Sequence, residues 1–251
     1  MDIKLAVLID ADNIPSAYVK EMMEEIAKYG IPTIKRIYGD WTQPRLNKWK
    51  GVLLENAITP IQQYGYTTGK NATDSAMIID AMDVLYSGKV DGFCLVSSDS
   101  DFTRLAIRLR EAGMSVYGIG EKKTPDPFIV ACDKFIYLEI LKPKPSRTSK
   151  VRPKTDTDTD TESTQSGVDK ITRKVLKLIS QTVSDCADED GWAFLGDVGS
   201  LIQKKQPNFD SRNYGFEKLT PLINSTGKFE IERRETSSGR NKLIYVKNKK
   251  R

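Results

Sequence analysis

Histidine is absent from this 251-residue chain, and its absence excludes several common kinds of catalytic site. No Ser-His-Asp triad, no histidine general acid or base and no histidine-ligated zinc can form. The three cysteines, Cys94, Cys132 and Cys186, are odd in number, widely spaced and without a C-x-x-C pair. They indicate neither a disulfide framework nor a cysteine zinc site. Metal-activated water is the chemistry that this composition leaves most open.

Long apolar runs are missing as well. No stretch of 18 or more apolar residues occurs, so we expect no transmembrane helix and no membrane partner. The segment Met1–Lys4 leads directly into a strand-like run, without the basic and then apolar profile of a signal peptide. These features predict a cytoplasmic protein.

Charge is distributed unevenly along the chain, whose net charge is +5. Residues 1–140 contain 16 Lys and Arg against 19 Asp and Glu, whereas residues 169–251 contain 17 against 11. The acidic first part suits a cation site, and the basic second part suits a polyanion.

The first 140 residues alternate between strand-like and helix-like patterns. Continuous apolar runs such as Lys4–Asp10 and Phe93–Ser97 indicate strands buried on both faces. In Arg45–Ala57 and Thr73–Tyr86 the apolar residues recur at helical spacing. This alternation predicts right-handed βαβ units and an α/β fold with a mostly parallel sheet flanked by helices.

A second domain follows a change in composition. Residues 142–167 are rich in Pro, Ser, Lys and Arg and then alternate Thr with Asp, which predicts a flexible linker. The basic start of this linker is either a solubilising tether or an auxiliary phosphate contact. We therefore predict domains at residues 1–141 and 168–251.

Three helical patterns, a short strand-like stretch at Trp192–Leu195 and two further strands make up the second domain. The helices are expected at Ile171–Val183, Leu195–Lys205 and Tyr214–Ser225, and the strands flank a polar tip at residues 236–240. This layout predicts a small winged helix-turn-helix domain, which would offer a recognition helix and a basic wing to nucleic acid.

Aspartates gather where strands end or helices begin. Asp10 and Asp12 follow the first strand, Asp99 and Asp101 follow a later one, and Asp74 opens a helix. Ligands of an open α/β sheet collect at the carboxyl ends of its strands. Clustered carboxylates repel one another, and bound Mg²⁺ or Mn²⁺ would offset that cost. We predict Asp10, Asp74, Asp99 and Asp101 as metal ligands with Asp12 in support, although Asp74 or Asp101 alone would also suit a helix cap.

Several polar residues are candidates for substrate contacts. Asn13 either positions an acidic neighbour or caps the helix expected from Pro15. Lys70, in a polar loop before Asp74, either holds a scissile phosphate or is merely exposed. In the second domain the candidate phosphate contacts, each of which is otherwise a solvated surface residue, are Lys204, Lys205, Arg212 and Arg240.

The acidic motifs also carry a family resemblance. The runs LIDADN at residues 8–13, KNATD at 70–74 and SSDSDF at 97–102, together with Asp80, resemble the NYN domain, a LabA-like relative of PIN-type nucleases. The resemblance covers about residues 4–140. It implies a PIN-like fold and a metal-dependent ribonuclease site built from Asp10, Asp74 and Asp99, supported by Asp12, Asp101 and Asn13.

The second domain resembles the OST-HTH domain, also called LOTUS. The motifs that carry this resemblance are WAFLG at residues 192–196, PNFD at 207–210, RNYG at 212–215 and Leu219. It implies RNA binding or the docking of a protein partner.

Together these observations predict an Mg²⁺- or Mn²⁺-dependent (endo)ribonuclease that acts on RNA, and they leave endonucleolytic and exonucleolytic cleavage both open. One alternative is a non-catalytic RNA-binding or regulatory adaptor. Another is a phosphatase or nucleotidase, which would give no reason for a basic winged domain. PIN-like domains often pair, so a homodimer is one alternative for the oligomeric state, although the sequence contains no interface signature.

Overall fold

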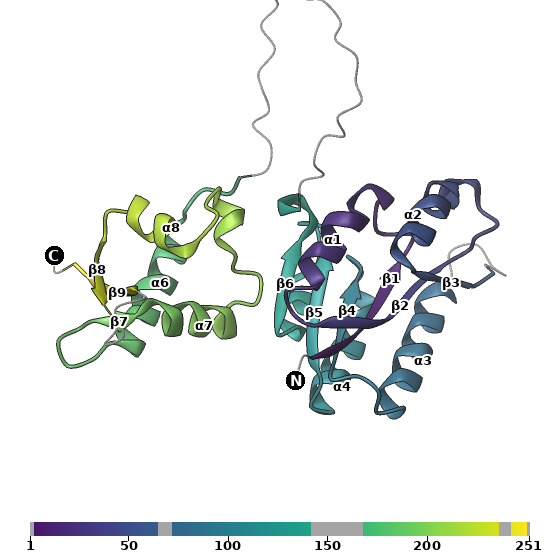
Figure 1. Cartoon of the computed structure of the whole chain (residues 1–251), viewed down its shortest axis with the longest axis horizontal. Coiled ribbons are helices and arrows are strands. Elements are labelled where there is room, and N and C mark those ends of the chain that lie inside the picture. The colour runs from purple at the N-terminus through teal and green to yellow at the C-terminus, as the bar shows by residue number, and fades with distance from the viewer. Residues whose placement is uncertain (1–2, 65–71, 142–167, 236–241, 250–251) are drawn as a thin grey trace, which may run out of the picture.

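The computed structural model describes residues 3–64, 72–141, 168–235 and 242–249, which form an α/β domain and a smaller winged-helix domain (Figure 1). Lys70, Arg240 and the predicted linker at 142–167 lie outside the described residues. Within the described part, no helix is both long and apolar enough to span a bilayer.

The α/β domain is built on six strands that all pair in parallel, in the order β3-β2-β1-β4-β5-β6. The predicted parallel sheet is therefore confirmed. The chain runs outward from β1 to one edge and then from β4 to the other, so the order reverses between these two neighbours. Ligand sites of such sheets lie at this switch point. The strands are β1 (Lys4–Asp10), β2 (Ile31–Gly39), β3 (Thr59–Gln62), β4 (Gly92–Val96), β5 (Ser115–Gly120) and β6 (Lys134–Tyr137).

Helices cover both faces of the sheet, which explains the uninterrupted apolar strands. In β1, Leu5, Val7 and Ile9 pack into one core, and Ala6 and Leu8 pack into the core on the opposite face. The first core includes side chains of α1 (Val19–Ile26) and α2 (Trp49–Asn56). The second includes side chains of α3 (Ala72–Tyr86), α4 (Thr103–Glu111) and α5 (Asp126–Ala131). Short 3₁₀ helices η1 (Ser16–Tyr18), η2 (Pro44–Lys48), η3 (Ser100–Phe102) and η4 (Leu138–Ile140) complete the domain.

The winged-helix domain has a core of its own, in which Ile179, Val198, Leu222 and Val246 are fully buried. Its three strands form an antiparallel sheet in the order β7-β9-β8. The helices are α6 (Arg173–Cys186), α7 (Leu195–Lys205), η5 (Ser211–Tyr214) and α8 (Leu219–Ser225), and the strands are β7 (Ala193–Phe194), β8 (Phe229–Glu235) and β9 (Lys242–Asn248).

The third helix of this domain is shorter than the sequence predicts. We expected a helix from Tyr214 to Ser225, whereas α8 begins at Leu219. Gly215 has a φ of 82°, a left-handed conformation that ends η5. Pro221 consequently lies in the first turn of α8, where its missing N–H costs little.

The two domains meet at β6, the last strand of the parallel sheet (Figure 1). The backbone N–H of Phe135 in β6 donates to the carbonyl of Pro207, at 3.0 Å. Beside it, the side-chain amide of Asn208 donates to the Tyr137 hydroxyl at 2.8 Å. The winged-helix domain thus hydrogen-bonds to a sheet edge whose backbone groups would otherwise be open to pairing with another chain.

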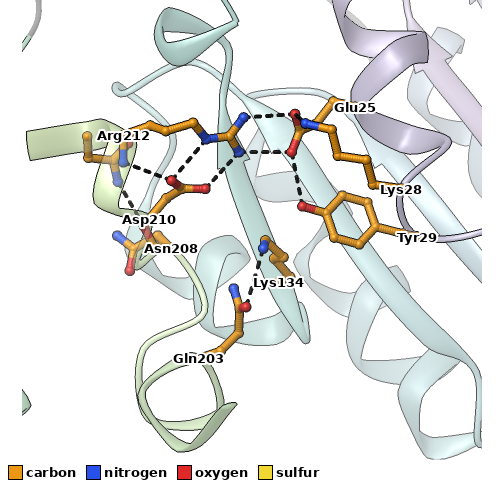
Figure 2. A network of polar contacts seen from close by, with 9 residues as sticks. Glu25, Lys28, Tyr29, Lys134, Gln203, Asn208, Asp210 and Arg212 are labelled. Carbon is orange, nitrogen blue, oxygen red and sulfur yellow. Dashed lines mark hydrogen bonds and ion pairs between the residues drawn. The ribbon is translucent and has the colours of Figure 1, made fainter. Parts of the chain in front are cut away.

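An ion-pair network adjoins this edge (Figure 2). The Arg212 guanidinium donates to both carboxylate oxygens of Glu25 in α1 and also to Asp210. Lys28 and Tyr29 donate to the same Glu25 carboxylate. Burial raises the pKa of Glu25, but the hydrogen bonds from Arg212 and Lys28 outweigh it and lower that pKa to about 2.

Candidate metal centre

Asp10 ends β1 with its side chain almost completely buried. Its Oδ1 accepts the backbone N–H of Asp12 at 3.0 Å, and its Oδ2 accepts the Ser97 hydroxyl at 2.9 Å. The side-chain amide of Asn13 also donates to Oδ2. Asn13 therefore positions an acidic neighbour and does not cap the helical turn after Pro15, which has no side-chain cap.

The residues after β4 form a second set of local hydrogen bonds. Because β4 pairs with β1, Ser97 lies beside Asp10, and its oxygen also accepts the backbone N–H of Asp99 at 3.1 Å. Oδ1 of Asp99 in turn accepts the backbone N–H of Asp101 at 2.9 Å and so caps η3. Asp99 is thus a helix cap and, at the same time, a carboxylate held at the switch point of the sheet.

Three carboxylates converge here. One oxygen from each of Asp74, Asp99 and Asp101 lies within 4.8 Å of the other two. Asp74 comes from the first turn of α3, where the helix dipole favours negative charge. Ligand oxygens of one octahedral Mg²⁺ are about 2.9 Å apart when adjacent and about 4.2 Å apart when opposite, so the three carboxylates would close in around a shared ion. Among the predicted ligands, Asp10 is outside this group but close enough to perturb Asp74.

The electrostatics of Asp74 indicate an excess of negative charge. Burial, followed by repulsion from Asp10, Asp99, Asp101 and Asp12, raises its pKa to about 6. A divalent cation would remove this repulsion, and carboxylate oxygens are the ligands that Mg²⁺ and Mn²⁺ prefer. The residues present therefore fit such an ion.

Family comparisons agree with this architecture. Residues 4–139 match the NYN domain, and residues 168–240 match the OST-HTH/LOTUS domain. The chain belongs to the NYN family. It matches no functionally curated protein.

Two solved structures are similar to parts of the chain. A protein of unknown function from Vibrio parahaemolyticus is 19% identical, with a TM-score of 0.46, over 53% of this chain and 91% of its own. An uncharacterized protein from Nitrosomonas europaea is 28% identical, with a TM-score of 0.31, over 40% of this chain and 94% of its own.

Asp12 in the NYN domain faces a different environment from the three clustered carboxylates. Arg45 in η2 pairs with it at 3.0 Å. Burial raises the pKa of Asp12, Arg45 opposes that rise, and Asp10 and Asp40 add to it. A pocket of about 330 Å³ adjoins the pair and is also lined by Lys48 and Trp49. Asp12 therefore connects the acidic site to a pocket with two cations.

Asp80, which is part of the NYN resemblance, makes its hydrogen bonds with residues outside the group of three carboxylates. It accepts hydrogen bonds from Arg36 and from the Tyr38 hydroxyl, both in β2. Its contacts tie α3 to the sheet and so support the position of Asp74 one and a half turns earlier.

Two of the three described candidates for phosphate contacts in the winged-helix domain are held by acidic side chains. Lys204 is exposed, and Lys205 pairs with Asp185. Arg212 is bound by Glu25 and Asp210 at the domain contact. In this arrangement Arg212 holds the two domains together, which the sequence analysis did not anticipate.

Ser97 and Arg45 are site residues that we did not predict from the sequence. Ser97 directly follows a buried strand, as Asp10 ends one, and that position was the available signal. Arg45 lies 33 residues from its partner Asp12 in the chain, and nothing in the local pattern indicates that they meet.

Proposed function

We propose that this NYN protein is a ribonuclease that depends on a divalent metal ion and hydrolyses RNA phosphodiester bonds. The convergence of Asp74, Asp99 and Asp101 at the switch point of the sheet carries the proposal. The OST-HTH/LOTUS domain on the same chain supports RNA as the substrate.

Each acidic residue has a proposed role. Asp74, Asp99 and Asp101 would hold Mg²⁺ or Mn²⁺, and Asp10 would join them directly or through water. The bound ion would lower the pKa of a water molecule and neutralise charge on the phosphate. Ser97 and Asn13 keep the Asp10 carboxylate in place through the hydrogen bonds described above. Asp12 would orient the attacking water.

The substrate would enter from the side of Asp12. Arg45 and Lys48 line the pocket there and can neutralise a phosphate beside the acidic site. Lys70 is a further proposed phosphate contact. In this arrangement Arg45 exchanges its ion pair with Asp12 for one with RNA.

A direct test compares RNA with small phosphoesters. Purified protein is incubated with end-labelled single-stranded RNA, structured RNA and a mononucleotide, in Mn²⁺, in Mg²⁺ and in chelator. We expect cleavage of RNA in the presence of metal, none in chelator, and slower reaction of the mononucleotide. Faster hydrolysis of the mononucleotide would instead support a nucleotidase.

A second candidate function is a non-catalytic RNA-binding adaptor. The observation that favours it is the state of Asp10, whose carboxylate is already held by three donors and lies outside the convergent group. RNA that is bound and left uncut under every metal condition would support this alternative.

A further inference from the structure

A basic groove lies on the winged-helix domain between the first half of α6 and the open end of the β8–β9 hairpin. It has a volume of about 780 Å³, and its cations are Arg173 and Lys177 from α6 and Lys228 and Lys249 from the hairpin. No Asp or Glu is among the described residues that line it. We refer to it as the α6 groove.

The local structure aligns these cations. Arg173 and Lys177 are four residues apart, so they lie on the same side of α6. Phe229 in β8 pairs with Asn248 in β9, and the backbone N–H of Lys249 donates to the carbonyl of Lys228 at 3.1 Å. The two hairpin lysines are therefore neighbours across the strands.

Asn248 fixes the distance between the two walls. Its side-chain oxygen accepts the Ser180 hydroxyl at 2.9 Å, and its side-chain amide donates to the Ser180 carbonyl at 3.0 Å. These bonds tie the end of the hairpin to α6. The groove is consequently formed before any ligand binds, which lowers the cost of ordering its walls.

The cations of the groove have little compensation from the described acidic side chains. Among the described residues, Arg173, Lys177 and Lys228 make no ion pair with a carboxylate, and the Lys249 ammonium donates to the Gly227 carbonyl. By contrast, Lys205 and Arg212 are bound by acidic side chains. A linear polyanion would neutralise the whole row of cations.

The helix in the position of a recognition helix offers no such charge. α8 consists of the residues LTPLINS, none of which is charged. The sequence predicts a recognition helix and a basic wing as the parts that meet nucleic acid. The cations of the groove instead lie on α6 and at the base of the hairpin, and none of them is in α8.

We propose that the α6 groove binds the phosphate backbone of an RNA strand. This inference rests on the proposed function, because RNA is the polyanion that the NYN domain would cleave. The residues described at the domain contact do not line the groove. The groove can therefore hold RNA while the two domains remain in contact.

The test measures RNA binding separately from cleavage. The full chain carrying Asp99→Asn, in chelator, is titrated into labelled single-stranded RNA at several salt concentrations. Lys177→Glu/Lys228→Glu is compared with Lys89→Glu/Lys218→Glu, which removes two exposed lysines outside the groove. The neutral pair Lys177→Gln/Lys228→Gln guards against a folding defect in the first variant, and circular dichroism checks all three.

We expect the groove variant to bind RNA at least about tenfold more weakly than the parent protein. Its slope of log affinity against log salt should fall by about 1.4, since roughly 0.7 is lost for each contact to a single strand. The neutral pair should show a smaller change in the same direction, and the Lys89/Lys218 variant should keep the parent affinity.

Three outcomes would overturn the inference: no RNA binding by the parent, equal affinity of groove variant and parent, or loss of binding only in the Lys89/Lys218 variant. The proposed ribonuclease can fail independently. If RNA binding depends on the groove but the wild-type chain never cuts RNA, the groove proposal is supported and the ribonuclease proposal is contradicted. If the protein cleaves RNA in a metal-dependent reaction but its RNA binding does not depend on the groove, the ribonuclease proposal is supported and the groove proposal is contradicted.

Discussion

Arg212 in the winged-helix domain donates one hydrogen bond from each terminal nitrogen to the two carboxylate oxygens of Glu25 in the NYN domain, both at 2.8 Å. Only 3% of the Glu25 side chain is exposed. A bidentate pair of this kind fixes orientation as well as distance. The domain that carries the α6 groove is thereby held against a defined edge of the NYN sheet.

Removal of Arg212 should release the domains from each other. Arg212→Ala leaves the buried Glu25 carboxylate without its main partner, at a cost on the order of 3 kcal/mol. We expect a larger radius of gyration in small-angle X-ray scattering. Lys28→Ala is the matched control, because Lys28 binds the same carboxylate but is mostly exposed and contributes little. An unchanged radius in Arg212→Ala would show that the pair does not hold the domains.

The same contact should weaken in acid. The pKa of Glu25 in the folded protein is about 2, below its ordinary value of 4.5. The stabilisation is therefore complete above pH 4.5 and is lost as the pH falls from there toward 2. Scattering between pH 7 and pH 3 should show progressive expansion of the wild-type chain. Glu25→Gln should be expanded at pH 7 already; a compact Glu25→Gln protein would contradict this explanation.

Metal affinity should depend on pH through Asp74. Since the pKa of Asp74 is raised from 3.8 to about 6, its contribution to the stability of the metal-free protein declines as the pH rises from about 4 through 6. Deprotonation is required for ligation, so Mn²⁺ should bind about tenfold more weakly at pH 5 than at pH 7. Thermal shifts induced by Mn²⁺ at both pH values measure this. Asp74→Asn should bind weakly at both; an equal shift for the wild type at both pH values would refute the assignment.

Ser97 should matter for activity more than for stability. Its buried hydroxyl joins Asp10 to the backbone N–H of Asp99, so Ser97→Ala removes one of the three donors that hold the Asp10 carboxylate in place. Loss of such a supporting bond typically costs 10- to 100-fold in metal affinity or activity. Ser98→Ala is the matched control, because that hydroxyl accepts the Glu121 N–H and is not bonded to Asp10.

Both serine variants should lose about 1 to 2 kcal/mol of unfolding free energy, since each leaves a donor without its partner. Only Ser97→Ala should lose RNA cleavage and Mn²⁺ affinity. Equal activity of the two variants would show that the hydroxyl of Ser97 does not position the site.

The parallel sheet and the acidic switch point were accessible from sequence, because buried strands and strand-end aspartates leave local patterns. The shorter α8 was not, since a single left-handed glycine, Gly215, outweighed a helical pattern. Arg45, Arg212 and the α6 groove depend on residues that are far apart in the chain. Their positions follow from tertiary packing, about which charge and spacing alone say nothing.

We propose that Asp74, Asp99 and Asp101 form a metal site at which RNA is cleaved. Single-turnover cleavage of labelled RNA in Mn²⁺ tests this proposal most directly. The wild type is compared with Asp99→Asn and with Asp83→Asn, a control on the exposed side of α3. We expect cleavage by the wild type and by Asp83→Asn, and a loss of at least about a hundredfold in Asp99→Asn. Equal rates for all three proteins would contradict the assignment of the site.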